Sequence, residues 1–172
     1  MEATKLSDEN LLLLSKASLE SGNTEQAMEQ CLAYLSTEPD DVVALRLYAT
    51  LCGMKSDLSK AIEIIGKVIS LNALEEPCDY FYRGRWRIKT GQLDGAIRDF
   101  GRVIEICQEN KNSYYLEDAY LHQAIAFFYQ ENREKTVSAL SHVSDDCRTS
   151  INGVVFSKSY IVQHPVSGNG IG

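Results

Sequence analysis

A short motif recurs along this chain at nearly constant spacing. Three segments, TEQAMEQCLAYL, LSKAIEIIGKVI and LDGAIRDFGRVI, each place an alanine ahead of apolar residues. Their alanines, Ala27, Ala61 and Ala96, follow one another at steps of 34 and 35 residues. A weaker fourth copy, REKTVSALSHV, has Thr136 in the alanine position after a step of 40, and residues 110–116 are the natural place for the extra length. Such a period indicates stacked supersecondary units, each too small to bury its apolar face alone.

Each unit contains two amphipathic helical patterns. In the first unit, Leu11, Leu14 and Ser18 share the spacing of one helix face, and a second pattern follows from Ala27. Gly22 stands where the first helix must end, as Gly91 does in the third unit, because glycine accepts the left-handed conformation of a helix C-cap.

The ends of these helices have further signals. Asn23 and Gln26 have the spacing of a capping box at the start of the second helix. Pro39 and Pro77 fall between units, where a helix cannot simply continue.

A period of 34 residues with two helices per unit resembles the tetratricopeptide repeat family. The resemblance covers roughly residues 8–144 and is best in the third unit, YFYRGRWRIKTGQLDGAIRDFGRVIEI. The matching positions there are Tyr80, Gly84, Gly91, Ala96, Phe100 and Val103. The resemblance implies an all-α fold, an α-solenoid of about four helix-turn-helix units in a domain spanning 1–144. The expected units are residues 8–41, 42–76, 77–110 and 117–144.

The sequence also departs from the family pattern. Arg87 stands where the pattern usually has an aromatic residue, and Cys31 and Ile65 replace the large aromatic of the second helix. Thr136 replaces the alanine of the fourth unit, so we expect that unit to be distorted.

The arginine-rich and aromatic stretch of the third unit is interpreted as packing. Gly84 is expected to be small because two helices cross there, since no Lys-Ser or Lys-Thr pair of a phosphate loop follows it. Tyr80 and Phe100 are expected to pack between helices.

The spacing of the arginines in this stretch places them on different sides of the helix. Arg83 points into the repeat and is expected to face Asp99 across the unit, in the geometry that the family resemblance implies. Arg85 lies on the opposite side.

Residues 145–172 are expected to form a capping hairpin and a flexible tail. Asn152-Gly153 lies between two short β-prone runs, which is a hairpin signal. SKSYIVQ could form a last half-turn of helix, and HPVSGNGIG, rich in glycine, is expected to be mobile. The hairpin's expected role is to cover the apolar end of the solenoid.

The composition limits which classes of partner and which compartment the chain fits. The chain has 172 residues and a formal net charge of −7, which argues against general nucleic-acid binding because that depends on neutralising phosphates. No run of apolar residues is long enough to span a membrane. Five cysteines in no metal-binding spacing fit a reducing cytoplasm, where free cysteine fills cores.

No residue pattern predicts catalysis, a cofactor or a metal site. His122, His142 and His164 have no helical zinc spacing, and a lone histidine is more often a satisfied core or surface residue. The adjacent acids at residues 75–76 and 145–146 are interpreted as solvated charge. The prediction is therefore that the chain is not an enzyme.

The family resemblance implies that the first helices line a concave, peptide-binding groove. The candidates are Lys16, Arg46, Thr50, Phe81, Arg85, Lys89, Leu121, His122 and Tyr129. Their mixture of cationic and apolar side chains fits a peptide with acidic and apolar residues. The alternative is that these are simply solvated helix charges.

The family's groove for the C-terminal carboxylate of heat-shock chaperones needs asparagines that this chain lacks. Leu13, Leu47 and Tyr82 stand at one such place, and Lys16 and Thr50 at another. That ligand is therefore not expected.

The predicted function is a non-catalytic, cytoplasmic adaptor that binds a protein or peptide. A dedicated chaperone or an immunity-type partner of a secreted effector or toxin is a special case of this function. A structural, self-associating repeat protein is the alternative class, and the oligomeric state stays open.

Overall fold

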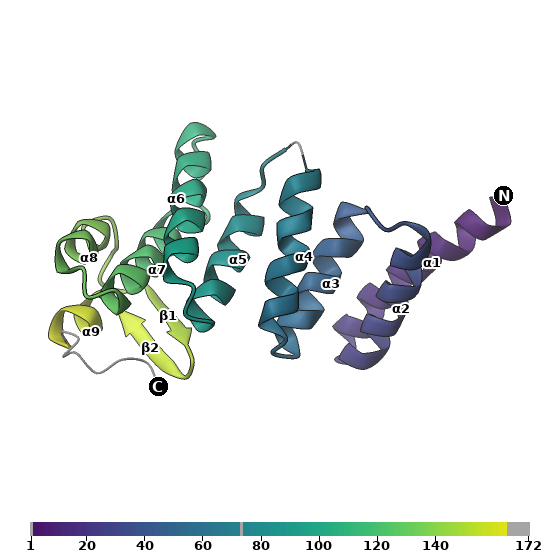
Figure 1. Ribbon diagram of the computed structural model, residues 1–172, viewed down its shortest axis with the longest axis horizontal. Coiled ribbons are helices and arrows are strands. Elements are labelled where there is room, and N and C mark those ends of the chain that lie inside the picture. The colour runs from purple at the N-terminus through teal and green to yellow at the C-terminus, as the bar shows by residue number, and fades with distance from the viewer. Residues whose placement is uncertain (1, 73, 165–172) are drawn as a thin grey trace. The chain divides into compact units, whose positions relative to one another are not determined.

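The computed structural model of the chain describes residues 2–72 and 74–164. Within these ranges the chain is almost entirely helical, with one two-stranded antiparallel sheet near its C-terminal end (Figure 1). The elements are α1 (Glu2–Glu20), α2 (Thr24–Thr37), α3 (Val42–Met54), α4 (Leu58–Leu71), α5 (Pro77–Lys89), α6 (Leu93–Glu109), α7 (Leu116–Tyr129), α8 (Arg133–Leu140), β1 (Arg148–Ile151), β2 (Val154–Ser157) and α9 (Lys158–Gln163).

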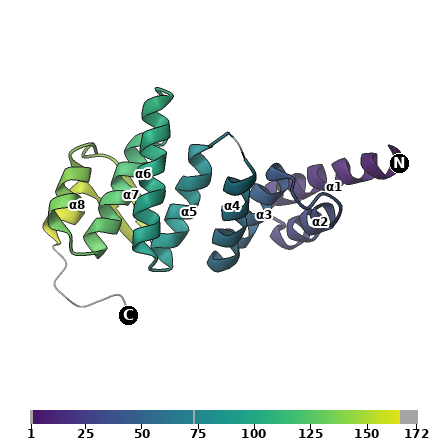
Figure 2. The ribbon, with the colours of Figure 1, turned by 45° about the horizontal axis from the view of Figure 1, so that its top comes forward.

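The helices pack as consecutive pairs within two compact units, Met1–Leu74 and Glu75–Gly172. In the first unit α1 packs on α2 and α3 on α4, which lie side by side in both views (Figures 1 and 2). In the second unit α5 packs on α6, α6 on α7, and α7 on α8. The predicted all-α solenoid architecture with a C-terminal hairpin is confirmed, and the boundaries of the individual repeats stay predictions.

The turns inside the four helix pairs share one geometry. Gly22 and Gly91 have φ values of 79° and 75°, which confirms the prediction that they end a helix in the left-handed conformation. Ser56 and Glu131 adopt the same conformation without glycine, at φ values of 63° and 58°. In each turn the residue that follows the left-handed one donates its backbone N–H to the carbonyl five positions earlier, as in a Schellman motif.

The N-terminal caps of the second helices also recur. The side chains of Asn23, Asp57 and Asn132 each accept a hydrogen bond from the backbone N–H three residues later. Asn23 Nδ2 also donates to Gln26 Oε1 at 3.0 Å, so the predicted pairing of these two residues is present. Pro77 opens α5 in its first turn, where proline is tolerated.

The core of the first unit departs from the predicted phase of α1 by one residue. Ser15, not Leu14, is buried against α2, and its hydroxyl donates to the carbonyl of Ala27 at 2.6 Å. Leu14 is 51% exposed. Cys31 is fully buried, as expected for a cysteine that fills a core.

The core of the second unit forms around Phe100, which is fully buried. A Cβ atom on Gly84 would lie only 2.8 Å from Phe100 Cζ, so α5 and α6 cross where only glycine fits. This confirms the prediction for Gly84. Tyr80 packs against the same cluster and donates its hydroxyl to Glu75 Oε1 at 2.6 Å.

The fourth helix pair is unequal. α8 has 8 residues, whereas its partner α7 has 14. Thr136 is buried in the alanine position, and its hydroxyl donates to the carbonyl of Asn132 at 2.8 Å. The threonine is thus accommodated by a bond within its own helix.

The C-terminal segment forms the predicted hairpin and last helix. Asn152 and Gly153 both have positive φ values, 50° and 79°, as a two-residue hairpin turn requires. Ile151 and Phe156 project from the two strands into the core of the second unit. The hairpin therefore covers apolar surface of this unit. Of the tail predicted to be mobile, residues 164–172, all but His164 lie outside the described part.

Candidate interaction surface

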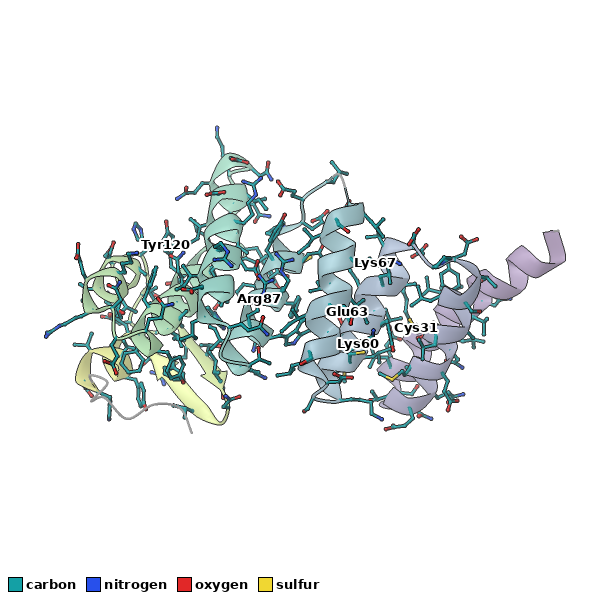
Figure 3. All side chains as sticks on the ribbon, viewed as in Figure 1. Cys31, Lys60, Glu63, Lys67, Arg87 and Tyr120 are labelled. Carbon is teal, nitrogen blue, oxygen red and sulfur yellow. The ribbon has the colours of Figure 1, made fainter. Side chains whose placement is uncertain are left out.

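The arginines of α5 have two different environments. Arg83 Nη2 lies 2.7 Å from Asp99 Oδ1, and Arg87 Nη1 lies 2.8 Å from Asp99 Oδ2. Figure 3 labels Arg87, which reaches from α5 to the start of α6, where it also contacts the carbonyl of Gly95. The predicted pairing of Arg83 with Asp99 is confirmed. The sequence did not reveal Arg87 as its second partner, because the family pattern expects an aromatic residue there.

In the first unit, the predicted groove residues lie on the first helix of each pair. Lys16 on α1 and Thr50 on α3 are exposed, whereas Arg46 is half-buried. Thr50 donates its hydroxyl to the carbonyl of Arg46 within the same helix, at 2.9 Å. The side chains of Lys16 and Thr50 are thus accessible to a partner.

In the second unit, three predicted contact residues are buried, which corrects their assignment to a ligand surface. Leu121 is fully buried, and Phe81 and His122 are nearly so. The Phe81 ring packs edge-on against both Phe100 and His122. These side chains form the core of this unit and offer no surface to a ligand.

The hairpin is the physical reason for much of this burial. Its Thr149 Oγ1 lies 3.2 Å from His122 Nε2, and Phe156 packs edge-on against Tyr129, which is half-buried. His122 Nδ1 lies 2.7 Å from the carbonyl of Asp118 and must donate to it, so Nε2 accepts the Thr149 hydroxyl proton. Burial lowers the pKa of His122 to about 4, which keeps the ring neutral. The face of α7 that was predicted to line a groove is therefore covered.

The side of α5 away from Asp99 is exposed. Tyr82, Arg85, Trp86 and Lys89 have the spacing of one helical stripe, and we call them the α5 stripe. Tyr82 is 43% exposed, Lys89 is exposed, and Arg85 and Trp86 are partly exposed. The rings of Tyr82 and Trp86 lie 6.1 Å apart between centroids. Arg85 and Lys89 were predicted as surface residues, whereas Tyr82 and Trp86 beside them were not, although their spacing of four residues places them on one helix face.

Arg85 has an incomplete set of polar partners. Its guanidinium carbon lies 5.9 Å from the centre of the Phe81 ring, and its Nε is buried without a hydrogen-bond partner in the described part of the chain. The nearby Asp118 has a raised pKa because of burial and the neighbouring Glu117, while Arg85 acts in the opposite direction. Arg85 influences this carboxylate without forming an ion pair with it.

The acidic pairs of the linkers are not purely solvated. Glu75 binds the guanidinium of Arg102, which together with Tyr80 lowers the pKa of Glu75 to about 2. Asp145 is 95% exposed and lies 3.5 Å from Lys158. On the surface of α4, Lys60 and Glu63 form a similar local pair (Figure 3). These carboxylates thus have ordinary structural partners.

Neither a metal site nor a membrane span is found in the described residues. Over 2–72 and 74–164, no group of three or more histidine, cysteine, aspartate or glutamate residues is placed to hold a metal ion. Within the same ranges no helix is both long and apolar enough to cross a bilayer.

Several solved structures have a fold similar to that of this chain. A structure of MamA superimposes with a TM-score of 0.71 at 20% identity, over 82% of this chain and 78% of that one. MamA from Desulfovibrio magneticus RS-1 gives a TM-score of 0.70 at 18% identity, over 78% of this chain and 72% of that one. A tetratricopeptide repeat protein from Parabacteroides merdae gives 0.70 at 16% identity, over 80% of this chain and 52% of that one. No model of a protein family matches the sequence, and no curated protein is similar to it.

Proposed function

We propose that this chain, which has the tetratricopeptide repeat fold, is a non-catalytic module that binds another polypeptide through the exposed sides of its first helices. This fold generally serves protein interaction rather than catalysis. The partner we propose has acidic and apolar side chains, and the binding residues come from Lys16, Arg46 and Thr50 in the first unit and from Arg85 and Lys89 in the second.

One observation carries the proposal. In a chain with a net charge of −7, exposed lysines lie on first helices in both units, Lys16 on α1 and Lys89 on α5. Surface cations add little to folding but attract an oppositely charged partner over several ångströms.

The location we propose is the cytoplasm. All five cysteines are free thiols, and Cys31, Cys52 and Cys107 are buried. Unpaired thiols persist in a reducing compartment, whereas oxidising compartments favour disulfides.

Affinity capture from the native cell lysate tests the proposal. We expect the double reversal Lys16→Glu and Lys89→Glu to lose the partners that the wild type retains, because like charges then meet the partner. The matched control is Lys111→Glu with Arg133→Glu, which changes the net charge equally at exposed positions outside the first helices. Equal partner yields from wild type and from the Lys16 and Lys89 variant, at equal helicity, would exclude the first helices as the binding site.

A further inference from the structure

The basic side chains of the second unit differ in whether a carboxylate neutralises them. Arg83 and Arg87 share Asp99, and Arg102 pairs with Glu75. Arg85 and Lys89, by contrast, have no ion pair with any residue in the ranges that the structure describes. Two cations one helical turn apart on α5 therefore have no ion-pair partner among the described residues.

Arg85 is held in place although no carboxylate of the described residues lies within ion-pair distance of it, Asp118 included. Its guanidinium lies over the edge of the second unit's aromatic core, 5.9 Å from the centre of the buried Phe81 ring. A cation over an aromatic ring is attracted by the ring's quadrupole and loses conformational freedom before any ligand arrives. Less ordering then remains to be done when a ligand carboxylate binds it.

The aromatic half of the α5 stripe adds an apolar surface next to these cations. Tyr82 and Trp86 lie one turn apart, with their ring planes inclined by 32°, on the same helix face as Arg85 and Lys89. Large aromatic residues contribute strongly to binding surfaces because they bury much area at little entropic cost. The stripe thus combines an apolar surface with positive charge along the length of α5.

Neighbouring α7 does not extend this surface. Its His122 is buried under the hairpin residue Thr149, and Tyr129 packs against Phe156. A ligand of the second unit therefore meets the α5 stripe without displacing the hairpin.

We propose that the α5 stripe binds an extended segment of a partner polypeptide in which carboxylates alternate with apolar side chains, and that Arg85 determines this specificity. The spacing agrees: four residues of helix rise about 6 Å, close to the ~6.7 Å between alternate side chains of an extended chain. Carboxylates two positions apart then reach Arg85 and Lys89. This inference rests on the proposed function and specifies its partner in the second unit.

The only tryptophan in the sequence, Trp86, lies in the stripe and serves as the readout. The probes are three heptapeptides blocked at both ends, with phenylalanine alternating with aspartate, asparagine or lysine. We expect the aspartate peptide to change Trp86 emission saturably, and the asparagine peptide to bind about tenfold more weakly, since the neutral amide loses the charge-assisted bonds to Arg85 and Lys89. The lysine peptide should not bind.

Arg85→Gln should weaken binding of the aspartate peptide about tenfold, while Arg85→Lys should weaken it less because the charge remains. Arg133→Gln on α8, an exposed arginine away from the stripe, is the matched control and should leave the affinity unchanged. Circular dichroism of each variant establishes that the helices are intact.

Equal affinity for the aspartate and asparagine peptides, or an Arg85→Gln variant that binds like the wild type, would overturn the inference. So would Trp86 emission that changes with protein concentration alone, because a second copy of the chain would then occupy the stripe. If the peptides fail while the Lys16 and Lys89 reversals still abolish partner capture, this inference is wrong and the proposed function stands. If those reversals leave capture unchanged as well, both are wrong.

Discussion

At the scale of single residues, two glycines inside helices differ in how much room their surroundings leave for a side chain. A Cβ on Gly84 would lie 2.8 Å from Phe100 Cζ, whereas a Cβ on Gly101 would meet Gln123 Nε2 at an ordinary 3.6 Å. Gly84→Leu should therefore destabilise the second unit by ~1–3 kcal/mol or more, as overpacking does. Gly101→Ala should instead be neutral or stabilise by up to about 1 kcal/mol, because alanine favours helix.

Urea unfolding of the two glycine variants measures both effects. An unchanged unfolding midpoint for Gly84→Leu would mean that α5 and α6 do not cross at this residue.

His122 should make the stability of the protein depend on pH. Burial lowers its pKa from 6.5 to about 4, so the unfolded chain binds a proton in this range that the folded protein does not. The free energy of unfolding should have its full value above pH 6.5 and should fall by about 2–4 kcal/mol as the pH drops to 4. The raised pKa of Asp118 acts in the opposite direction, so the comparison between variants isolates His122.

His122→Gln should show a smaller loss of unfolding free energy over this pH range than the wild type does. Chemical denaturation at a series of pH values gives the comparison. Parallel pH curves for His122→Gln and wild type would contradict a buried, neutral His122.

Single residues also show how far the sequence could be interpreted. Gly22, Gly84 and Gly91 were predicted correctly because each has a local reason, a turn or a close crossing. The helical pattern of α7 could not show which segment covers His122, because the covering residue Thr149 lies 27 residues later in a hairpin that docks on α7 through tertiary contacts. Helical phase alone does not predict which side of a helix a distant segment covers.

At the scale of elements, Asp99 joins α5 to α6 through two arginines. Its side chain is 3% exposed, and both guanidinium groups are within 2.8 Å of its oxygens. Asp99→Leu leaves two half-buried guanidinium groups without their carboxylate and should cost about 3 kcal/mol. Arg83→Met should cost less, because Arg87 remains bound to Asp99.

A double-mutant cycle with Arg83→Met and Asp99→Leu should give a coupling energy of about 0.5–3 kcal/mol. The unfolding free energies of wild type, both single variants and the double variant supply it. A coupling near zero would place this ion pair in solvent rather than between the helices.

The hairpin offers a comparison between neighbouring residues of β2. Phe156 is 2% exposed in the core beside α7, whereas Val155 is 57% exposed. Phe156→Ala should lower the unfolding free energy by about 3–5 kcal/mol, and Val155→Ala by less than about 0.5 kcal/mol. Similar small effects of both changes on thermal unfolding would show that the hairpin does not stabilise α7.

At the scale of the whole molecule, the period of the sequence predicted the architecture. Steps of 34 and 35 between Ala27, Ala61 and Ala96 placed buried alanines on α2, α4 and α6. The surface was harder to predict, because Arg87 and Arg85 differ by only two positions yet one is bound to Asp99 and the other is unneutralised. Whether an arginine meets a carboxylate depends on the neighbouring helix, which the period does not specify.

The central claim is that a polypeptide binds on the first helices, and site-specific photo-crosslinking in native cell extract tests it most directly. The crosslinking residue replaces Thr50 on α3 or Lys89 on α5, and for comparison Ser70 on α4 or Lys111 after α6, all four exposed. We expect a covalent protein adduct from positions 50 and 89 and none from positions 70 and 111. Adducts from positions 70 or 111 alone would contradict the claim, because the partner would then bind the second helices or the loop.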